Sequence, residues 1–328
     1  MRAIALVPLL LSGFIASPAL AQNMPRGMMN VFDTVQQRAP VDSTTQADEV
    51  KMRRDITDRM TVPVTVDGAG PFRFMVDTGA DRSAISSAMA ARLGLDTSEV
   101  ASLHSLTGMS TVRTATVSNV KLSEKSFRIV DAPILEAANM GADGILGTDS
   151  LSSQRVVFDF EKNVMTIVPA EQQVPREDGT IVVTGKLRNG RLIVTNAVAD
   201  GTIITVVLDT GAEVSIGNEA LRRRLGNAGL VKSTGEVGLQ SVTGAMLQGE
   251  YTFVKRLEVG DVNLANLAVV FADAHTFDKL GLGDRPALLL GMNALRAFKK
   301  VSIDFASKKL RVILPETGSL PQVLLAAR

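Results

Sequence analysis

The chain has 328 residues, of which 45% are hydrophobic and 21% are charged, and its formal net charge is +1 at pH 7. This composition is typical of a globular protein long enough for two domains, and it gives no reason to expect nucleic acid or an acidic membrane surface as a partner. The sequence has no cysteine and only two histidines, His104 and His275. Disulfides and thiol nucleophiles are therefore excluded, and carboxylates remain the obvious chemical groups.

Residues 1–21 have the pattern of a signal peptide. Arg2 provides a positive start, residues 4–15 form an interrupted apolar run, and Ala19-Leu20-Ala21 is a small-x-small cleavage site. Because the run is short for a membrane anchor, we expect cleavage between Ala21 and Gln22, export to the periplasm or out of the cell, and no membrane span afterwards. Residues 22–50 lack clear periodicity, which predicts a disordered leader; a propeptide that covers a cleft is the alternative.

The first predicted domain spans residues 51–168. Two apolar strands joined by an Asp67-Gly68 turn come first, and the second strand runs directly into Asp77-Thr78-Gly79-Ala80. The features that follow are a short helix over residues 86–93 ended by Gly94, a Thr107-Gly108 turn, strands over residues 112–120 and 127–130, Ile145-Leu146-Gly147, and a strand with Asp159-Phe160. Residues 169–180 are polar and contain proline and glycine, which predicts a linker between domains.

The second predicted domain spans residues 181–314, and a short tail follows at residues 315–328. It begins with strands around an Asp200-Gly201 turn that lead into Asp209-Thr210-Gly211-Ala212. The later features are a helix over residues 218–225 ended by Gly226, a Thr243-Gly244 turn, Leu289-Leu290-Gly291, and a strand with Asp304-Phe305. Both domains thus carry the same features in the same order, and the two loop aspartates lie 132 residues apart (209 minus 77). We interpret the chain as one ancestral unit that was duplicated.

These paired motifs resemble those of the retroviral-type, retropepsin-like aspartic proteases, over roughly residues 55–314. Retropepsins are homodimers in which each chain supplies one Asp-Thr-Gly loop, whereas this chain carries both loops. The resemblance therefore implies a single-chain pseudo-dimer: an all-β fold with two homologous β-barrel lobes, a cleft between them and a few short helices. It implies a monomer, although dimerisation of each lobe between chains is an alternative.

The resemblance also assigns roles to matching residues. Asp77 and Asp209 would be the catalytic pair, supported by Thr78, Gly79 and Ala80 in one loop and by Thr210, Gly211 and Ala212 in the other. The turns that would close as flaps over the substrate consist of Leu106, Thr107, Gly108, Val242, Thr243 and Gly244. The elements that would lie beneath the catalytic pair consist of Ile145, Leu146, Gly147, Leu289, Leu290 and Gly291.

Two neighbouring carboxylates suit peptide hydrolysis because, sharing one proton, they can act as base and acid on a water molecule and a peptide carbonyl. The sequence therefore predicts an exported aspartic endopeptidase that binds an extended peptide or protein segment and needs no metal or other cofactor. A catalytically idle peptide-binding protein with the same fold is the alternative. The aromatic content is 4% and the only tyrosine, Tyr251, follows the second flap, so aliphatic specificity pockets are expected. His104 and His275 are expected in loops and receive no catalytic role.

Overall fold

The computed structural model describes residues 49–51, 53–54, 60–122, 125–170, 172, 177–230, 235–315 and 325–327. The predicted signal peptide and nearly all of the predicted leader lie outside these residues. Within the described ranges, no helix is both long enough and apolar enough to cross a membrane.

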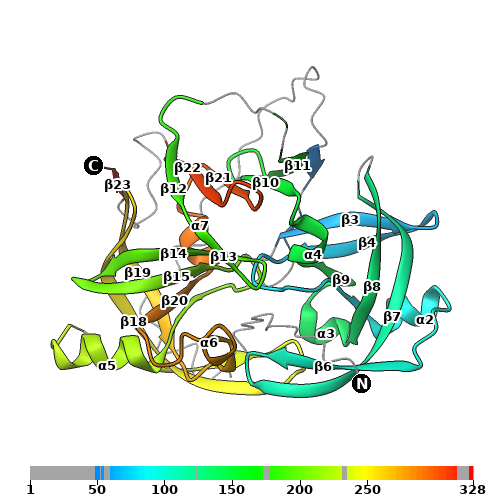
Figure 1. The fold of residues 1–328 in the computed structure, drawn as a ribbon, viewed down its shortest axis with the longest axis horizontal. Coiled ribbons are helices and arrows are strands. Elements are labelled where there is room, and N and C mark those ends of the chain that lie inside the picture. Colours follow the sequence, from blue (N-terminus) through cyan, green and yellow to red (C-terminus); the bar gives the residue numbers. More distant parts are fainter. Residues whose placement is uncertain are drawn as a thin grey trace.

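The protein is built mainly of strands, in two lobes that each contain one strongly curled sheet (Figure 1). In the first lobe the strand order is β2-β3-β4-β9-β5-β8-β7-β6, and β3 also pairs with β7. The strands are β2 (Arg53–Arg54), β3 (Met60–Val66), β4 (Ala69–Val76), β5 (Ala84–Ser86), β6 (Glu99–Ser105), β7 (Gly108–Leu122), β8 (Lys125–Leu135) and β9 (Gly144–Leu146). The helices of this lobe are α2 (Ser87–Arg92), α3 (Ala137–Met140) and α4 (Thr148–Leu151).

The second lobe repeats this topology. Its sheet runs β13-β14-β15-β20-β16-β19-β18-β17, β14 also pairs with β18, and β23 from the predicted tail pairs with β19. The strands are β13 (Lys186–Arg188), β14 (Arg191–Ala199), β15 (Thr202–Leu208), β16 (Ser215–Gly217), β17 (Gly235–Gln240), β18 (Met246–Val259), β19 (Val262–Phe271), β20 (Ala287–Leu290) and β23 (Leu325–Ala327). The helices are α5 (Glu219–Asn227), α6 (His275–Lys279) and α7 (Met292–Leu295). The prediction of two homologous all-β lobes is confirmed.

Local sequence explains most element ends. The Asp67-Gly68 and Asp200-Gly201 pairs all have positive φ, as a two-residue hairpin turn requires. The side chain of Ser86 caps α2 by accepting a hydrogen bond from the Met89 amide. One prediction was wrong: Gly226 does not end the second helix but lies inside α5, and the left-handed residue that follows this helix is Gly229.

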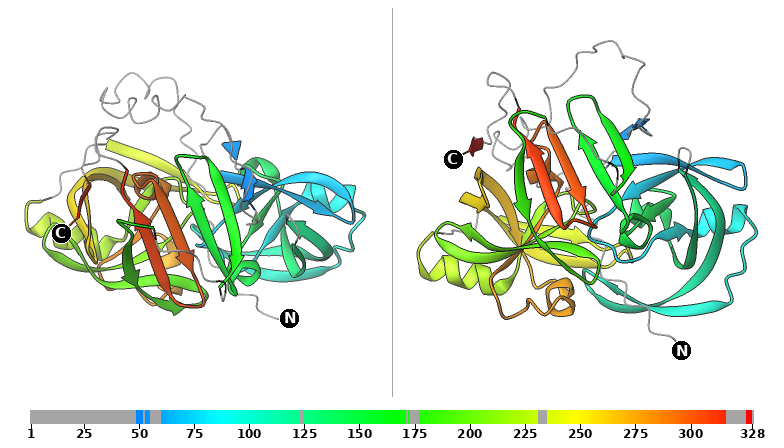
Figure 2. Two further views of the ribbon diagram at one scale, coloured as in Figure 1. Left: turned by 90° about the horizontal axis from the view of Figure 1, so that it is seen from above. Right: turned by 45° about the horizontal axis from the view of Figure 1, so that its top comes forward.

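A third sheet joins the two lobes. Its six strands run β1-β11-β10-β21-β22-β12, with β10 and β21 side by side at its centre (Figure 2). The strands are β1 (Glu49–Lys51), β10 (Gln154–Asp159), β11 (Val164–Pro169), β12 (Ile181–Thr184), β21 (Lys300–Asp304) and β22 (Lys309–Ile313). Arg155 of β10 donates hydrogen bonds to the buried carboxylate of Asp304 on β21, at 2.8 and 3.1 Å. The strands that end both predicted domains therefore connect the lobes.

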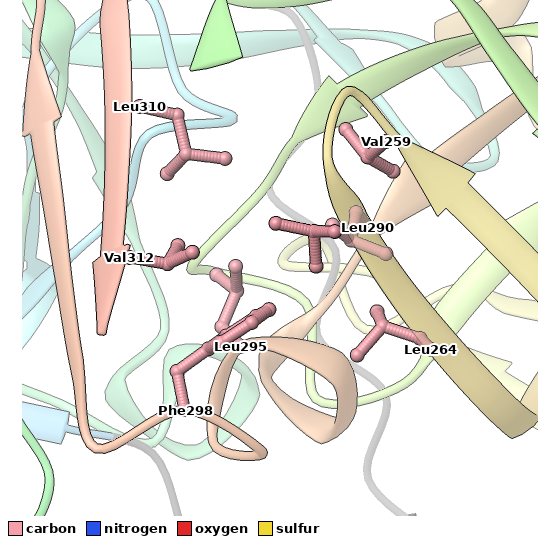
Figure 3. A pocket seen from close by; sticks show the side chains of 8 residues that line it. Val259, Leu264, Leu290, Leu295, Phe298, Leu310 and Val312 are labelled. Carbon is pink, nitrogen blue, oxygen red and sulfur yellow. The ribbon is translucent and has the colours of Figure 1, made fainter. Parts of the chain in front are cut away.

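The shared sheet packs on the second lobe through apolar side chains. Leu310 and Val312 of β22 face a small hollow whose other walls come from that lobe and from the segment after β20 (Figure 3). The other lining residues are Val259, Val262, Leu264, Leu290, Leu295 and Phe298. Because these side chains belong to the main hydrophobic core, the sheet and the lobe share one interior.

Candidate active site

The two Asp-Thr-Gly-Ala loops meet between the lobes. Asp77 follows β4 and Asp209 follows β15, and their side chains are 0% and 1% exposed. Beside each aspartate a short strand runs parallel: the Asp77 amide donates to the Leu146 carbonyl at 2.9 Å, and the Asp209 amide donates to the Leu290 carbonyl at 3.1 Å. The predicted elements beneath the pair, β9 with Gly147 and β20 with Gly291, thus hold the backbone of both aspartates.

Each carboxyl group is bound by its own loop. Oδ1 of Asp77 accepts hydrogen bonds from the amides of Gly79 and Ala80 at 2.7 and 3.1 Å. Oδ1 of Asp209 accepts the equivalent bonds from Gly211 and Ala212 at 3.0 and 3.1 Å. One oxygen of each group is therefore held by backbone donors, and the other is left for its partner or for a reacting molecule.

Glycine at the third position of each loop allows the two carboxyl groups to come together. A Cβ added at Gly79 would collide with the carboxyl group of Asp209, and a Cβ added at Gly211 would collide with that of Asp77. Each carboxyl group thus packs against the opposite loop, a close approach that only glycine permits.

The loop threonines lock the two lobes together. The Thr78 amide donates to Oγ1 of Thr210 at 3.0 Å, and the Thr210 amide donates to Oγ1 of Thr78 at 3.1 Å. The Thr78 hydroxyl donates to the Leu208 carbonyl at 3.0 Å, and the Thr210 hydroxyl donates to the Val76 carbonyl at 2.8 Å. These reciprocal, buried bonds fix the loops relative to each other, as the resemblance implies for this pair.

A second pair of supporting side chains was missed by sequence reasoning. The Ser83 hydroxyl accepts a hydrogen bond from the Gly147 amide at 3.0 Å and bonds to Asp149 at 2.7 Å. In the other lobe, Ser215 accepts from the Gly291 amide at 3.1 Å and bonds to Asn293 at 2.8 Å. The two serines are also 132 residues apart (215 minus 83), so the repeat itself was the signal that could have identified them.

The two predicted flap turns reach into opposite lobes. Leu106, in the turn between β6 and β7, is fully buried in an apolar cluster whose other members belong to the second lobe, including Val207 and Leu289. Val242, in the turn between β17 and β18, is 1% exposed in a cluster of first-lobe side chains that includes Ile145. The flap residues Thr107, Gly108, Thr243 and Gly244 are partly exposed. Each flap turn thus docks its apolar side chain in the opposite lobe, and both carboxyl groups are buried.

Each flap also contacts a helix of the opposite lobe. The Leu106 carbonyl accepts a hydrogen bond from the His275 amide at the start of α6, at 3.0 Å. Figure 1 shows α6 beside β6, the strand that leads into this flap. On the other side, Gln240 donates to the side chain of Asn139 in α3 at 3.2 Å. The flaps are thus held by polar bonds as well as by their buried apolar side chains.

The only two histidines of the sequence meet at the first of these contacts. Nδ1 of His104 on β6 lies 3.0 Å from Nε2 of His275, and the rings stack with their centroids 5.3 Å apart. His275 was predicted to lie in a loop, but it is the first residue of α6; His104 lies on a flap strand and is buried. Burial lowers the pKa of His104, and the positive charges of Lys279 and His275 lower it further.

The electrostatics of the two aspartates favour one shared proton. Burial raises the pKa of Asp77 well above its ordinary value and that of Asp209 to about 6. The charge of Asp209 raises the pKa of Asp77 further. The backbone donors and the guanidinium of Arg191 act in the opposite direction. Because two negative charges so close together repel, the pair titrates as a unit and keeps one proton.

Comparison with protein families identifies the fold. The family model described as "Aspartyl protease" matches residues 62–150 and 194–294, which together make up more than half of the chain. The chain belongs to the retropepsin-like aspartyl protease family. Each matched segment of this aspartyl protease contains one Asp-Thr-Gly-Ala loop, one flap turn and one Leu-Gly element, as expected for a tandem duplication. Among curated proteins, none matches the chain.

No group of three or more histidine, aspartate or glutamate side chains in the described ranges is placed to hold a metal ion. The polar groups that meet at the two loops include the two carboxyl groups, their backbone donors and Arg191.

Proposed function

We propose that this aspartyl protease is an exported endopeptidase that hydrolyses extended peptides with Asp77 and Asp209 as its catalytic pair. One observation carries the proposal: two buried carboxyl groups, one from each lobe, pack against each other's glycine, and burial raises the pKa of both. An idle peptide-binding protein would not need this arrangement, because burying two carboxyl groups side by side is costly for stability.

In the proposed mechanism a water molecule lies between the two carboxyl groups. The ionised group, Asp209, accepts a proton from this water, while the protonated group, Asp77, donates its proton to the peptide carbonyl oxygen. The water oxygen bonds to the carbonyl carbon and gives a tetrahedral intermediate. Transfer of a proton to the peptide nitrogen then breaks the C–N bond and releases a carboxylic acid and an amine. Flap turns that close again over the bound peptide would exclude other water during these steps.

Substrate binding requires the flap turns to leave their present positions. In the closed chain, Leu106 and Val242 fill the two apolar clusters on either side of the catalytic pair. When the flaps open, these clusters become available to substrate side chains, and their members close to the pair are mainly aliphatic. We therefore expect cleavage between residues with aliphatic side chains, with the flap backbone pairing to the peptide as added strands.

A cleavage profile of the purified protein on a mixed peptide library tests the proposal. Wild type should cut between aliphatic residues, and Asp77→Asn and Asp209→Asn should each abolish cutting; the double variant should be no worse than either single variant, because the pair acts as a unit. Asp178→Asn, at an exposed aspartate, is the matched control and should cut normally. Peptide binding by wild type without any cleavage would instead support the idle binding protein.

Further measurements address export, assembly, cofactor use and inhibition. The mature protein should begin at Gln22 and be recovered outside the cytoplasm. Light scattering of active protein should give a monomer, and a dimer whose dissociation abolishes activity would support pairing between chains. Chelators should leave the activity intact, whereas a peptide with a hydroxyl-bearing tetrahedral carbon should inhibit strongly.

A further inference from the structure

A fully buried arginine from the second lobe lies against the aspartate loop of the first lobe. Arg191, the first residue of β14, has a side chain that is 0% exposed. Its Nε donates a hydrogen bond to the Gly79 carbonyl at 2.6 Å, and its Nη1 donates to the Asn189 carbonyl at 3.3 Å. Its Nη2 lies 3.6 Å from Oδ1 of Asp81 and makes no hydrogen bond among the described residues.

The position of Arg191 is costly for the fold. A guanidinium removed from water is stable only when nearby groups compensate its charge. Asp81 supplies part of this compensation, but its side chain is 17% exposed and the contact is long. The remaining compensation comes from negative charge on the pair of Asp77 and Asp209, whose charges both favour the protonated form of Arg191. The cation and the charged pair therefore stabilise each other in a site that excludes water.

We propose that Arg191 is a positioning residue that fixes the first aspartate loop through the Gly79 carbonyl and stabilises the singly ionised form of the Asp77–Asp209 pair. The proposal rests on the proposed function, since that function needs one ionised and one protonated carboxyl group. Without a nearby cation, burial would keep both groups protonated to higher pH, and the pair would lack a base. Arg191 lowers the pKa of both carboxyl groups, and thus shifts the pH range in which only one of them is ionised to lower pH.

The charged groups that act on the two carboxyl groups decide which residues are varied in the experiment and which are kept. The charge of Asp209 raises the pKa of Asp77, the charge of Arg191 lowers the pKa of both carboxyl groups, and Asp81 acts on Arg191 in turn. Glu213 occupies the position equivalent to Asp81 in the second loop and stays unchanged in every variant. Arg188, in the same hairpin, donates to the Leu280 carbonyl at 2.6 Å and is the matched control arginine.

Four variants separate charge from geometry. Arg191→Met removes both the positive charge and the hydrogen bond to the Gly79 carbonyl, whereas Arg191→Lys keeps the charge but loses the bond from Nε. Asp81→Asn removes the negative charge near Arg191, and Arg188→Met is the control. The ionisation of the pair is followed by NMR titration of the aspartate carboxyl carbons, which needs no substrate. The pH profile of kcat/KM is measured on one fixed peptide.

We expect Arg191→Met to move both limbs of the pH profile, and the carboxyl titration, up by about one pH unit or more. At a pH on the acidic limb, kcat/KM should then fall about tenfold for each unit of the shift. Arg191→Lys should keep the wild-type pH limbs but show a lower kcat, because the loop is less well held. Asp81→Asn should move the titration down, since the field of Arg191 is then less compensated, and Arg188→Met should change neither measurement.

A folded Arg191→Met variant with an unmoved titration would overturn the proposal and leave Arg191 with a purely structural role. If Arg191→Met does not fold, Asp81→Asn decides, and an unmoved or upward titration in that variant overturns the proposal. Failure of the proposed function is a different result: wild type would cut no peptide, while the titration would still move as expected in the Arg191 and Asp81 variants.

Discussion

Replacing Asp209 with asparagine should stabilise the folded protein above about pH 6 and leave its stability nearly unchanged below about pH 4. The reason is that burial raises the pKa of Asp209 from its ordinary value of 3.8 to about 6. A carboxyl group with a raised pKa in the folded state contributes stability that is fully present below its unfolded pKa. This contribution is lost as the pH rises through the folded pKa, because the folded protein must then either bury a charge or keep a proton.

The size of the effect follows from the pKa difference. Each pKa unit corresponds to about 1.4 kcal/mol, so wild type should lose roughly 3 kcal/mol at Asp209 between acidic and neutral pH. Asparagine keeps the local geometry, since its Oδ1 can still accept the bonds that Gly211 and Ala212 donate to Asp209. Its amide nitrogen can donate to the carboxylate of Asp77, which removes the need for a shared proton.

Urea denaturation at several pH values between about 3.5 and 8 measures this difference. The free energy of unfolding of Asp209→Asn should exceed that of wild type by roughly 3 kcal/mol at pH 8 and should match it at pH 3.5. Asp178→Asn, which alters an exposed aspartate, should follow wild type throughout. Parallel curves for wild type and Asp209→Asn would show that the carboxyl groups are hydrated in solution, and would refute the buried, shared-proton pair.

Serine in place of Ala80 and Ala212 could donate a hydrogen bond to the ionised carboxylates, so this double variant should move the basic limb of the pH–rate profile down; an unmoved limb would contradict the proposed pair. Leu106→Ala should weaken flap docking by about 2–5 kcal/mol, seen as faster hydrogen exchange of the His275 amide that donates to this residue. Because the pKa of His104 is lowered, the histidine contact should stabilise the closed flap above about pH 6.5 and be lost as the pH falls through the lowered pKa. Exchange of the same amide should therefore speed up on acidification in wild type more steeply than in His104→Gln.

The duplicated architecture and the catalytic loops could be predicted from sequence because their determinants are local. An apolar strand that ends in Asp-Thr-Gly-Ala needs only a few neighbouring residues to form its turn, and the Asp-Gly hairpins need only residues that tolerate positive φ. Repetition of these local signals at a constant order then indicated two equivalent lobes. Where two local signals competed, as at Gly226 and Gly229, the sequence could not decide which glycine follows the helix.

The interactions that complete the site come from residues far apart in the chain. Leu106 docks in the second lobe, Arg191 reaches back to Gly79 at 112 positions' separation, and His104 meets His275 at a separation of 171. None of these side chains carries a local pattern that names its partner, since a buried arginine or histidine is indistinguishable in sequence from one on the surface.

The sequence by itself thus determined the strand pattern, the duplication and the pair of carboxyl-bearing loops. Only the tertiary structure decided that each flap turn docks in the opposite lobe and that six strands from both halves form one sheet. It also decided that the buried guanidinium of Arg191 lies beside the aspartate loop. The physical reason is that turns and strands respond to neighbouring residues, whereas burial and charge compensation depend on which distant surfaces the fold brings together.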